Sequence, residues 1–184
     1  MTASSAPART DARCRRHRRG ATNVTYAATE AQANAAIASA NSHKSTATAH
    51  YAAADGWQTI AEDHHDSFVT NYAVYRISNP PDTVCDLRLA AGNAAYDDGV
   101  EYMEDGDTFW TQGNSKLGQA IMAKNMMQYA TAVSLANEAK YLFIDASGEY
   151  RHAWDNDPVW GATGEFDEAV YWFDFAQERL DEID

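Results

Sequence analysis

The chain has 184 residues, of which 45% are hydrophobic and 11% aromatic; this composition excludes wholesale disorder and allows one domain with a buried core. Its formal net charge of −13 means that most of its surface repels nucleic acid and anionic membranes. No apolar run reaches the roughly 20 residues that span a bilayer, and the first residues lack the apolar core of a signal peptide. We therefore expect no membrane association and a cytoplasmic or particle-associated location.

The charge is divided between a basic arm and an acidic body. The arm, residues 1–22, contains six arginines and one acid and is poor in apolar residues, so we expect it to be disordered or extended. It is the part of the chain that could bind nucleic acid or an acidic partner protein; an inert arm is the simpler alternative. The candidate contact residues are Arg13, Arg15, Arg16, Arg18 and Arg19.

The body, residues 23–184, carries the opposite charge. It holds 26 acids against four lysines and four arginines. Such a surface repels itself at low salt, and dissolved salt screens the repulsion. The composition favours a high-salt organism or its virus as the source, and an ordinary acidic protein is the alternative.

A very long helix is predicted over residues 23–78. Alanine supplies about half of residues 27–54, and the apolar positions recur every three or four residues, as on one face of a helix. The pair Asp55-Gly56 is the one plausible break, but we favour a continuous helix, because one internal glycine costs only about 1 kcal/mol. We predict that Asn79-Pro80-Pro81 ends the helix.

Three shorter helices are predicted after it, and the sequence contains no sustained strand alternation. The predicted ranges are 82–104, 116–144 and 165–182, with a loop at 145–164. One apolar stripe of the middle helix comprises Met122, Met126, Tyr129, Val133, Ala136 and Phe143. The fold class is therefore an all-α bundle of about four helices, built as one domain (23–184) on a long alanine-rich helix.

The first half of the long helix contains small side chains almost exclusively. Each alanine buries too little area to anchor a fold, at about 25 cal/mol per Å², although it allows another helix to approach closely. We therefore predict that this half packs against other copies or other proteins. The predicted helix-packing interface comprises Ala33, Ile37, Ala40, Ala47, Tyr51 and Ala54.

Two Glu-x-x-His pairs are the nearest approach to a metal site. They are Glu62 with His65, and Glu149 with His152. Two such pairs on facing helices belong to the di-metal site of ferritin-like bundles, but the second pair lies in the predicted loop. The simpler interpretation is a solvated helix face, because a two-residue motif recurs by accident. We predict neither a metal nor a cofactor.

Histidines recur at a spacing of seven along the long helix. His43, His50 and His64 share this spacing with Trp57, so all four would lie along one seam. A buried row of this kind could act as a pH-sensitive device that sets helix register. Partly exposed histidines without such a role are the simpler expectation.

No catalytic set is recognisable, since nucleophile, phosphate-loop and dinucleotide motifs are all absent from the sequence. We expect a non-enzymatic structural or assembly protein that self-associates, or packs with other subunits, into a virion, filament or scaffold. One alternative is a regulatory protein that binds nucleic acid through the arginine-rich arm. The other is a ferritin-like di-metal bundle.

Overall fold

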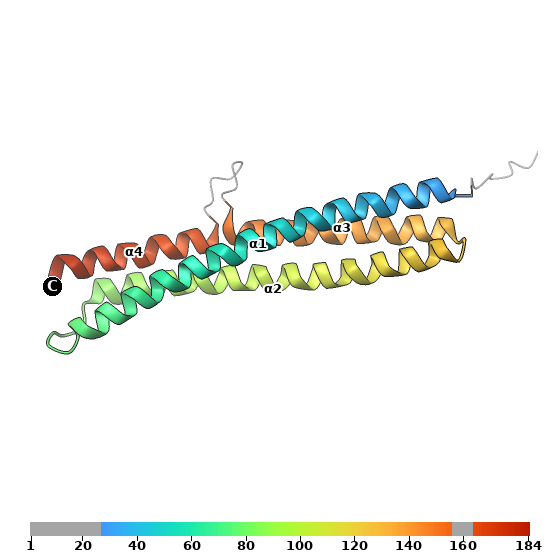
Figure 1. Ribbon diagram of the computed structural model, residues 1–184. Coiled ribbons are helices and arrows are strands. Elements are labelled where there is room, and N and C mark those ends of the chain that lie inside the picture. Colours follow the sequence, from blue (N-terminus) through green and yellow to red (C-terminus); the bar gives the residue numbers. More distant parts are fainter. Residues whose placement is uncertain (1–26, 156–163) are drawn as a thin grey trace, which may run out of the picture.

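The computed structural model describes residues 27–155 and 164–184, which form four α-helices. They are α1 (Glu30–Tyr75), α2 (Thr83–Asn125), α3 (Tyr129–Trp154) and α4 (Glu165–Ile183). Helices α1 and α2 form a long antiparallel hairpin, and α3 and α4 follow one another along it to complete a slender rod (Figure 1). At 1.5 Å per residue, α1 alone is roughly 70 Å long. The predicted all-α bundle on a very long N-terminal helix is confirmed, and the described residues contain no strand.

Helix α1 begins later than predicted and is continuous. Thr29 caps it, because its hydroxyl accepts a hydrogen bond from the Gln32 amide at 3.3 Å and the Gln32 side chain accepts one from the Thr29 amide at 2.8 Å. This reciprocal capping box sets the first helical residue at Glu30 rather than near residue 23; residues 23–26 lie outside the described part. The helix runs through Asp55-Gly56 without interruption, as we expected.

Helix α2 is much longer than predicted. The sequence suggested an end at residue 104, before Gly106, but the helix continues to Asn125. Its glycines do not break it, because four of them face the interior at intervals of seven and receive aromatic rings. A Cβ atom at Gly99 would stand 2.6 Å from Cε1 of Phe166, and one at Gly113 would stand 2.8 Å from Cε1 of Phe143. The other two, Gly92 and Gly106, receive Phe173 and Tyr150 in the same way.

This extension shifts the next helix along the chain. Residues 116–125, predicted to begin the third helix, belong to α2, and α3 begins at Tyr129. The loop predicted from residue 145 is wrong as far as Trp154, because α3 continues to that residue. The remainder of that loop, residues 156–163, lies outside the described part. The last predicted helix, 165–182, is confirmed within one residue.

Helices α3 and α4 meet end to end. A Cβ atom at Gly164 would overlap the backbone of Trp154, since it would stand 2.7 Å from its Cα atom. Only a glycine allows α4 to start so close to the last turn of α3. The two helices therefore serve together as the third member of the rod, beside the α1–α2 hairpin (Figure 1).

The core repeats every seven residues, which is the period of left-handed coiled coils. On α1 the buried residues at this spacing are Ala33, Ala40, Ala47, Ala54, Ala61 and Phe68, and Tyr72 is buried one turn after them. On α2 they include Cys85, Gly92, Gly99, Gly106, Gly113 and Ala120. On α3 and α4 alanines alternate with the large residues Phe143, Tyr150, Phe166, Phe173 and Leu180. Each large side chain therefore fills the space that small residues leave on the other two helices.

This complementarity overturns the expected role of the alanines on α1. Ala33, Ala40, Ala47 and Ala54 are 0% exposed within the single chain, so they cannot contact other copies. They pack against α2 and α3 of their own chain, where rings such as that of Phe143 supply the missing bulk. Of the other two predicted interface residues, Ile37 is half-buried against the same core and Tyr51 remains exposed beside Tyr150.

Candidate functional site

Glu62 and His65, the first Glu-x-x-His pair, line a groove of about 410 Å³. Four of its lining side chains already have polar partners within the protein. The Tyr96 hydroxyl donates a hydrogen bond to Glu62 at 2.5 Å, and Nδ1 of His65 lies 3.0 Å from Asp66. Burial and the Glu62 carboxylate raise the pKa of Tyr96, so its hydroxyl stays protonated and able to donate at neutral pH.

The second pair lies elsewhere on the rod. The His152 ring packs against Tyr102, with the ring centroids 5.4 Å apart. Within residues 27–155 and 164–184, no three His, Cys, Asp or Glu side chains come together as metal ligands would. Glu62, His65, Glu149 and His152 therefore do not form a common site in this structure.

The predicted histidine seam exists as a row of half-buried side chains, His43, His50, Trp57 and His64. Two of these histidines link α1 to α3 and α4. His50 Nδ1 lies 2.8 Å from the Ser147 hydroxyl of α3, and His64 Nδ1 lies 2.5 Å from Asp174 of α4. These contacts fix the position of α1 along α3 and α4; whether they respond to pH stays a hypothesis.

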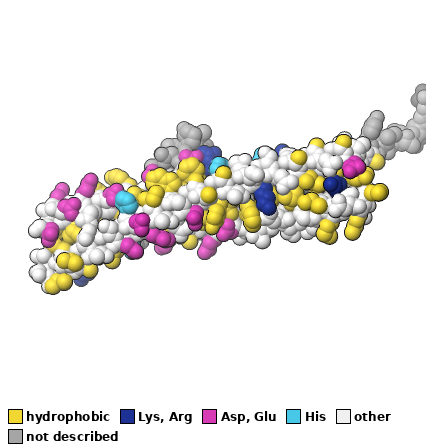
Figure 2. All heavy atoms as spheres, viewed as in Figure 1, with side chains coloured by type: hydrophobic (Ala, Val, Ile, Leu, Met, Phe, Trp, Pro, Cys, Tyr) yellow, Lys and Arg dark blue, Asp and Glu magenta, His cyan; other side chains and the backbone are white. Residues whose placement is uncertain are grey.

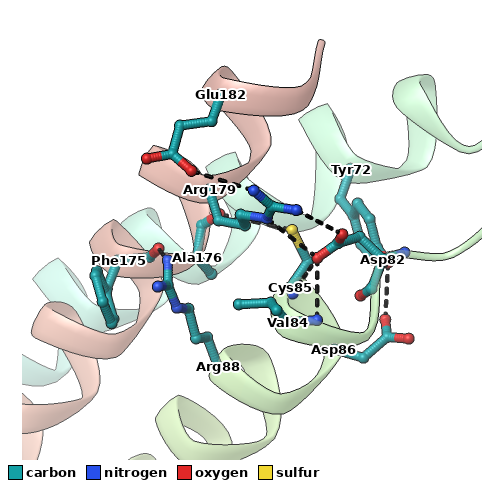
Figure 3. A network of polar contacts seen from close by, with 10 residues as sticks. All are labelled: Tyr72, Asp82, Val84, Cys85, Asp86, Arg88, Phe175, Ala176, Arg179 and Glu182. Carbon is teal, nitrogen blue, oxygen red and sulfur yellow. Dashed lines mark hydrogen bonds and ion pairs between the residues drawn. The ribbon is translucent and has the colours of Figure 1, made fainter.

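A polar network closes the end of the rod where α1 turns into α2 (Figure 3). Asp82 caps α2 by accepting hydrogen bonds from the amides of Val84 and Cys85, both at 3.0 Å. It also pairs with Arg179 of α4 at 3.2 Å. The hydrogen bond from Arg179, followed by those of the cap, holds the pKa of Asp82 below its usual value.

The same network involves the neighbouring helices. The Tyr72 hydroxyl of α1 accepts from the Asp82 amide at 2.9 Å and donates to Asp86 at 2.9 Å. Arg88 lies 3.2 Å above the ring centroid of Phe175 and donates to its backbone carbonyl. Burial raises the pKa of the Cys85 thiol to about 11, which keeps it protonated and unreactive. The network is thus a clamp that holds this end rigid.

Beside this clamp lies a group of exposed apolar residues that we call the turn face: Val74, Ile77, Val84 and Leu87. Ile77 lies two residues after Tyr75, the last residue of α1, and is 82% exposed. Pro80 and Pro81, which close the turn, are also exposed. The turn face is a firm surface, because the residues next to it are anchored to α1, α2 and α4 by the clamp.

A second exposed apolar group lies at the other end of the rod, on the last turns of α2. We call it the methionine cap: Ile121, Met122, Met126 and Met127. The sequence placed Met122 and Met126 in the core stripe of a third helix; the structure shows instead that Met122 is exposed on α2 and Met126 is exposed at its C-cap. The two apolar groups thus occupy opposite ends of the molecule (Figure 1).

Met127 is unusual in its backbone as well as its exposure. Its φ of 59° is the only positive value among the described non-glycine residues. It follows the last turn of α2, where the amide of Gln128 reaches back to the Ala123 carbonyl at 2.9 Å. Glycine is the common residue at this position, and a side chain there costs roughly 1 kcal/mol. A strained, 77% exposed methionine is therefore unfavourable for the isolated chain.

No protein-family model, curated protein or solved structure matches this chain. No helix of the described part is long and apolar enough to cross a membrane. The functional interpretation therefore rests on the exposed apolar side chains and the distribution of charge on the described surface.

Charge is distributed unequally between the two halves of the rod. The half that ends in the methionine cap, residues 27–54 and 108–144, holds four lysines and two acids. The remaining described residues hold 23 acids and four arginines. In Figure 2 acidic side chains accordingly dominate the half that contains α4 and the α1–α2 turn. The predicted acidic body is thus acidic over one half only.

Proposed function

We propose that this chain is a non-enzymatic structural subunit that associates with other copies or other subunits into a larger assembly such as a filament, scaffold or virion. One observation carries the proposal: large apolar side chains remain exposed at both ends of a rod whose own core is complete. Exposed apolar clusters commonly mark interaction sites. The high-salt source remains part of the proposal and is supported by the surplus of acids.

The form of the molecule agrees with such a role. A periodic core of alanine, glycine and aromatic residues makes a stiff spacer of roughly 70 Å. Every large buried side chain in the described core is used for packing between helices.

The test is the mass of the full-length protein in solution. We expect sedimentation velocity to show a weight-average mass that rises with protein concentration, at both 0.15 M and about 2 M salt. A strictly monomeric species under both conditions would refute the proposal.

Binding of nucleic acid through the arm is a second candidate, and one observation favours it. The arm joins the rod next to Ala27, on the half that carries lysines rather than on the acidic half, so repulsion of a polyanion is smallest there. Deleting residues 1–22 should abolish any salt-dependent binding to DNA or RNA. Unchanged affinity after the deletion would exclude this function.

A further inference from the structure

We infer that the methionine cap of one copy docks on the turn face of a second copy, so that the rods join head to tail. This inference rests on the proposed self-association and specifies which surfaces meet. None of these eight side chains belongs to a core cluster of its own chain, and their exposed fractions run from 39% at Val84 to 82% at Ile77. Five of them lie on the ends of α1 and α2, and the other three, Ile77, Met126 and Met127, lie in the turns that directly follow these helices.

The backbone at Met127 is the first reason to assign the methionine cap to a partner. Glycine would satisfy the left-handed conformation there without strain, and the fold needs no apolar side chain at a position that is 77% exposed. Burial against a partner would offset the strain, because each Å² of apolar side-chain area removed from water contributes about 25 cal/mol. Methionine also adapts its shape to irregular apolar surfaces.

Charge selects a second copy in one orientation. Residues 70–90 and 178–184, around the turn face, hold six acids and three arginines, whereas residues 27–40 and 108–144, around the methionine cap, hold three lysines and two acids. Two turn faces would therefore repel each other, and so would two methionine caps. A methionine cap against a turn face brings opposite charges together, which favours the head-to-tail contact.

The size of the contact determines its strength. Three packed helices of about 10 Å diameter present an end roughly 20 Å wide, so a joint buries on the order of 600 Å² in total. Stable interfaces generally bury about 1,200–2,000 Å², so each joint is weak and fills only at high protein concentration. Because the two surfaces differ, the association is open and extends into chains of rods rather than closing as a dimer.

The first test uses the strain at Met127. We expect Met127→Gly to raise the thermal midpoint of the monomer by about 2–4 °C and to weaken self-association about tenfold. The matched control is Tyr141→Ser, which removes a large side chain, 62% exposed, from the flank of α3; its association should match the original protein. A Met127→Gly protein that is more stable and associates unchanged would overturn the inference.

The second test determines which ends meet. In a Cys14→Ser background, with Cys85 buried, Met126→Cys and Leu87→Cys proteins are oxidised separately and as a mixture. We expect disulfide-linked dimers in the mixture only. Dimers of Met126→Cys alone or of Leu87→Cys alone would overturn the head-to-tail orientation.

The two proposals fail in different ways. If oligomers form in the sedimentation experiment but the mixture gives no cross-link, the head-to-tail contact is wrong and the assembly role stands. If the original protein stays monomeric up to millimolar concentration, both are wrong.

Discussion

Replacing Gly99 by alanine tests whether the glycines of α2 are packing residues. The new Cβ atom would stand 2.6 Å from Cε1 and 2.8 Å from Cδ1 of Phe166, whereas carbon atoms pack at about 3.5–4.0 Å. Phe166 is fully buried, so its ring has no solvent-filled space into which to move. Overpacking of this kind costs about 1–3 kcal/mol, while alanine in place of glycine gains about 1 kcal/mol in helix propensity. We expect the variant to lose up to about 2 kcal/mol of unfolding free energy.

Gly118 provides the matched control on the same helix. A Cβ atom there would have no neighbour within 4 Å, so Gly118→Ala should be more stable than the original protein by about 1 kcal/mol. The assay is urea unfolding followed by the helical circular-dichroism signal, and the free energies of unfolding of the two variants are compared. If Gly99→Ala stabilises the protein as much as Gly118→Ala does, the ring does not occupy the space above Gly99 and the packing scheme is wrong.

Phe166 supplies a further check through a double-mutant cycle. In a Phe166→Leu background the alanine at position 99 should cost less, because the smaller side chain leaves room for the new methyl group. Equal costs of Gly99→Ala in the two backgrounds would mean that the two residues do not interact.

Two further predictions concern charge. The pKa of Glu165 is raised, first by burial and then by Glu168 and Asp98. Its ionised form therefore destabilises the fold, and the free energy of unfolding increases as the pH falls through the raised pKa. In denaturant titrations Glu165→Gln should be more stable than the original protein at pH 7, by a difference that shrinks towards pH 4; a difference independent of pH would refute the assignment. The acids of the acidic half repel one another, and salt screens this repulsion because the Debye length falls from about 10 Å at 0.1 M to about 3 Å at 1 M. The thermal midpoint should therefore rise between 0.1 M and 2 M sodium chloride. A midpoint that does not change with salt would contradict both the repulsion and the proposed high-salt source.

The helical class and the continuity of α1 through Asp55-Gly56 follow from the sequence because they depend on local composition. Alanine favours the helix at each position. The predicted end at residue 78, before the proline pair, is three residues too late, because α1 ends at Tyr75. The boundary between α2 and α3 was mispredicted because it depends on tertiary packing. The helix was predicted to end at residue 104, just before Gly106, whereas the missing side chain of this glycine makes room for Tyr150, which lies more than forty residues away.

A signal for this packing is present in the sequence. Gly92, Gly99, Gly106 and Gly113 are spaced by seven, as are the paired aromatic residues 143 with 150 and 166 with 173. Four glycines at one heptad position indicate a helix face that receives large side chains, and they would have predicted an uninterrupted α2. The methionine cap could not have been found before that correction, because moving the helix boundary from residue 116 to residue 129 takes Met122 and Met126 out of the core stripe.

The periodicity that makes the rod stiff also leaves its register underdetermined. If α1 slid by seven residues along α3 and α4, most of its buried alanines would still meet similar layers, at little cost in apolar burial. Contacts that do not repeat must therefore select the native register. Two of them join α1 to these helices: His64 with Asp174 of α4, and His50 with the Ser147 hydroxyl of α3 at 2.8 Å. Asp82 with Arg179, and Asp107 with the Tyr150 hydroxyl at 2.8 Å, likewise fix α2 against α4 and α3.

These contacts also explain why the two ends differ in chemistry. Each lies in the acidic half or at its border, so that half is fixed by specific polar pairs. The half that ends in the methionine cap relies on small residues and on the single lysine–glutamate pair of Lys116 with Glu138, at 2.7 Å. A rod held in register from one end can present an adaptable apolar surface at the other without loss of order, which is the arrangement that a weak, extensible head-to-tail contact requires.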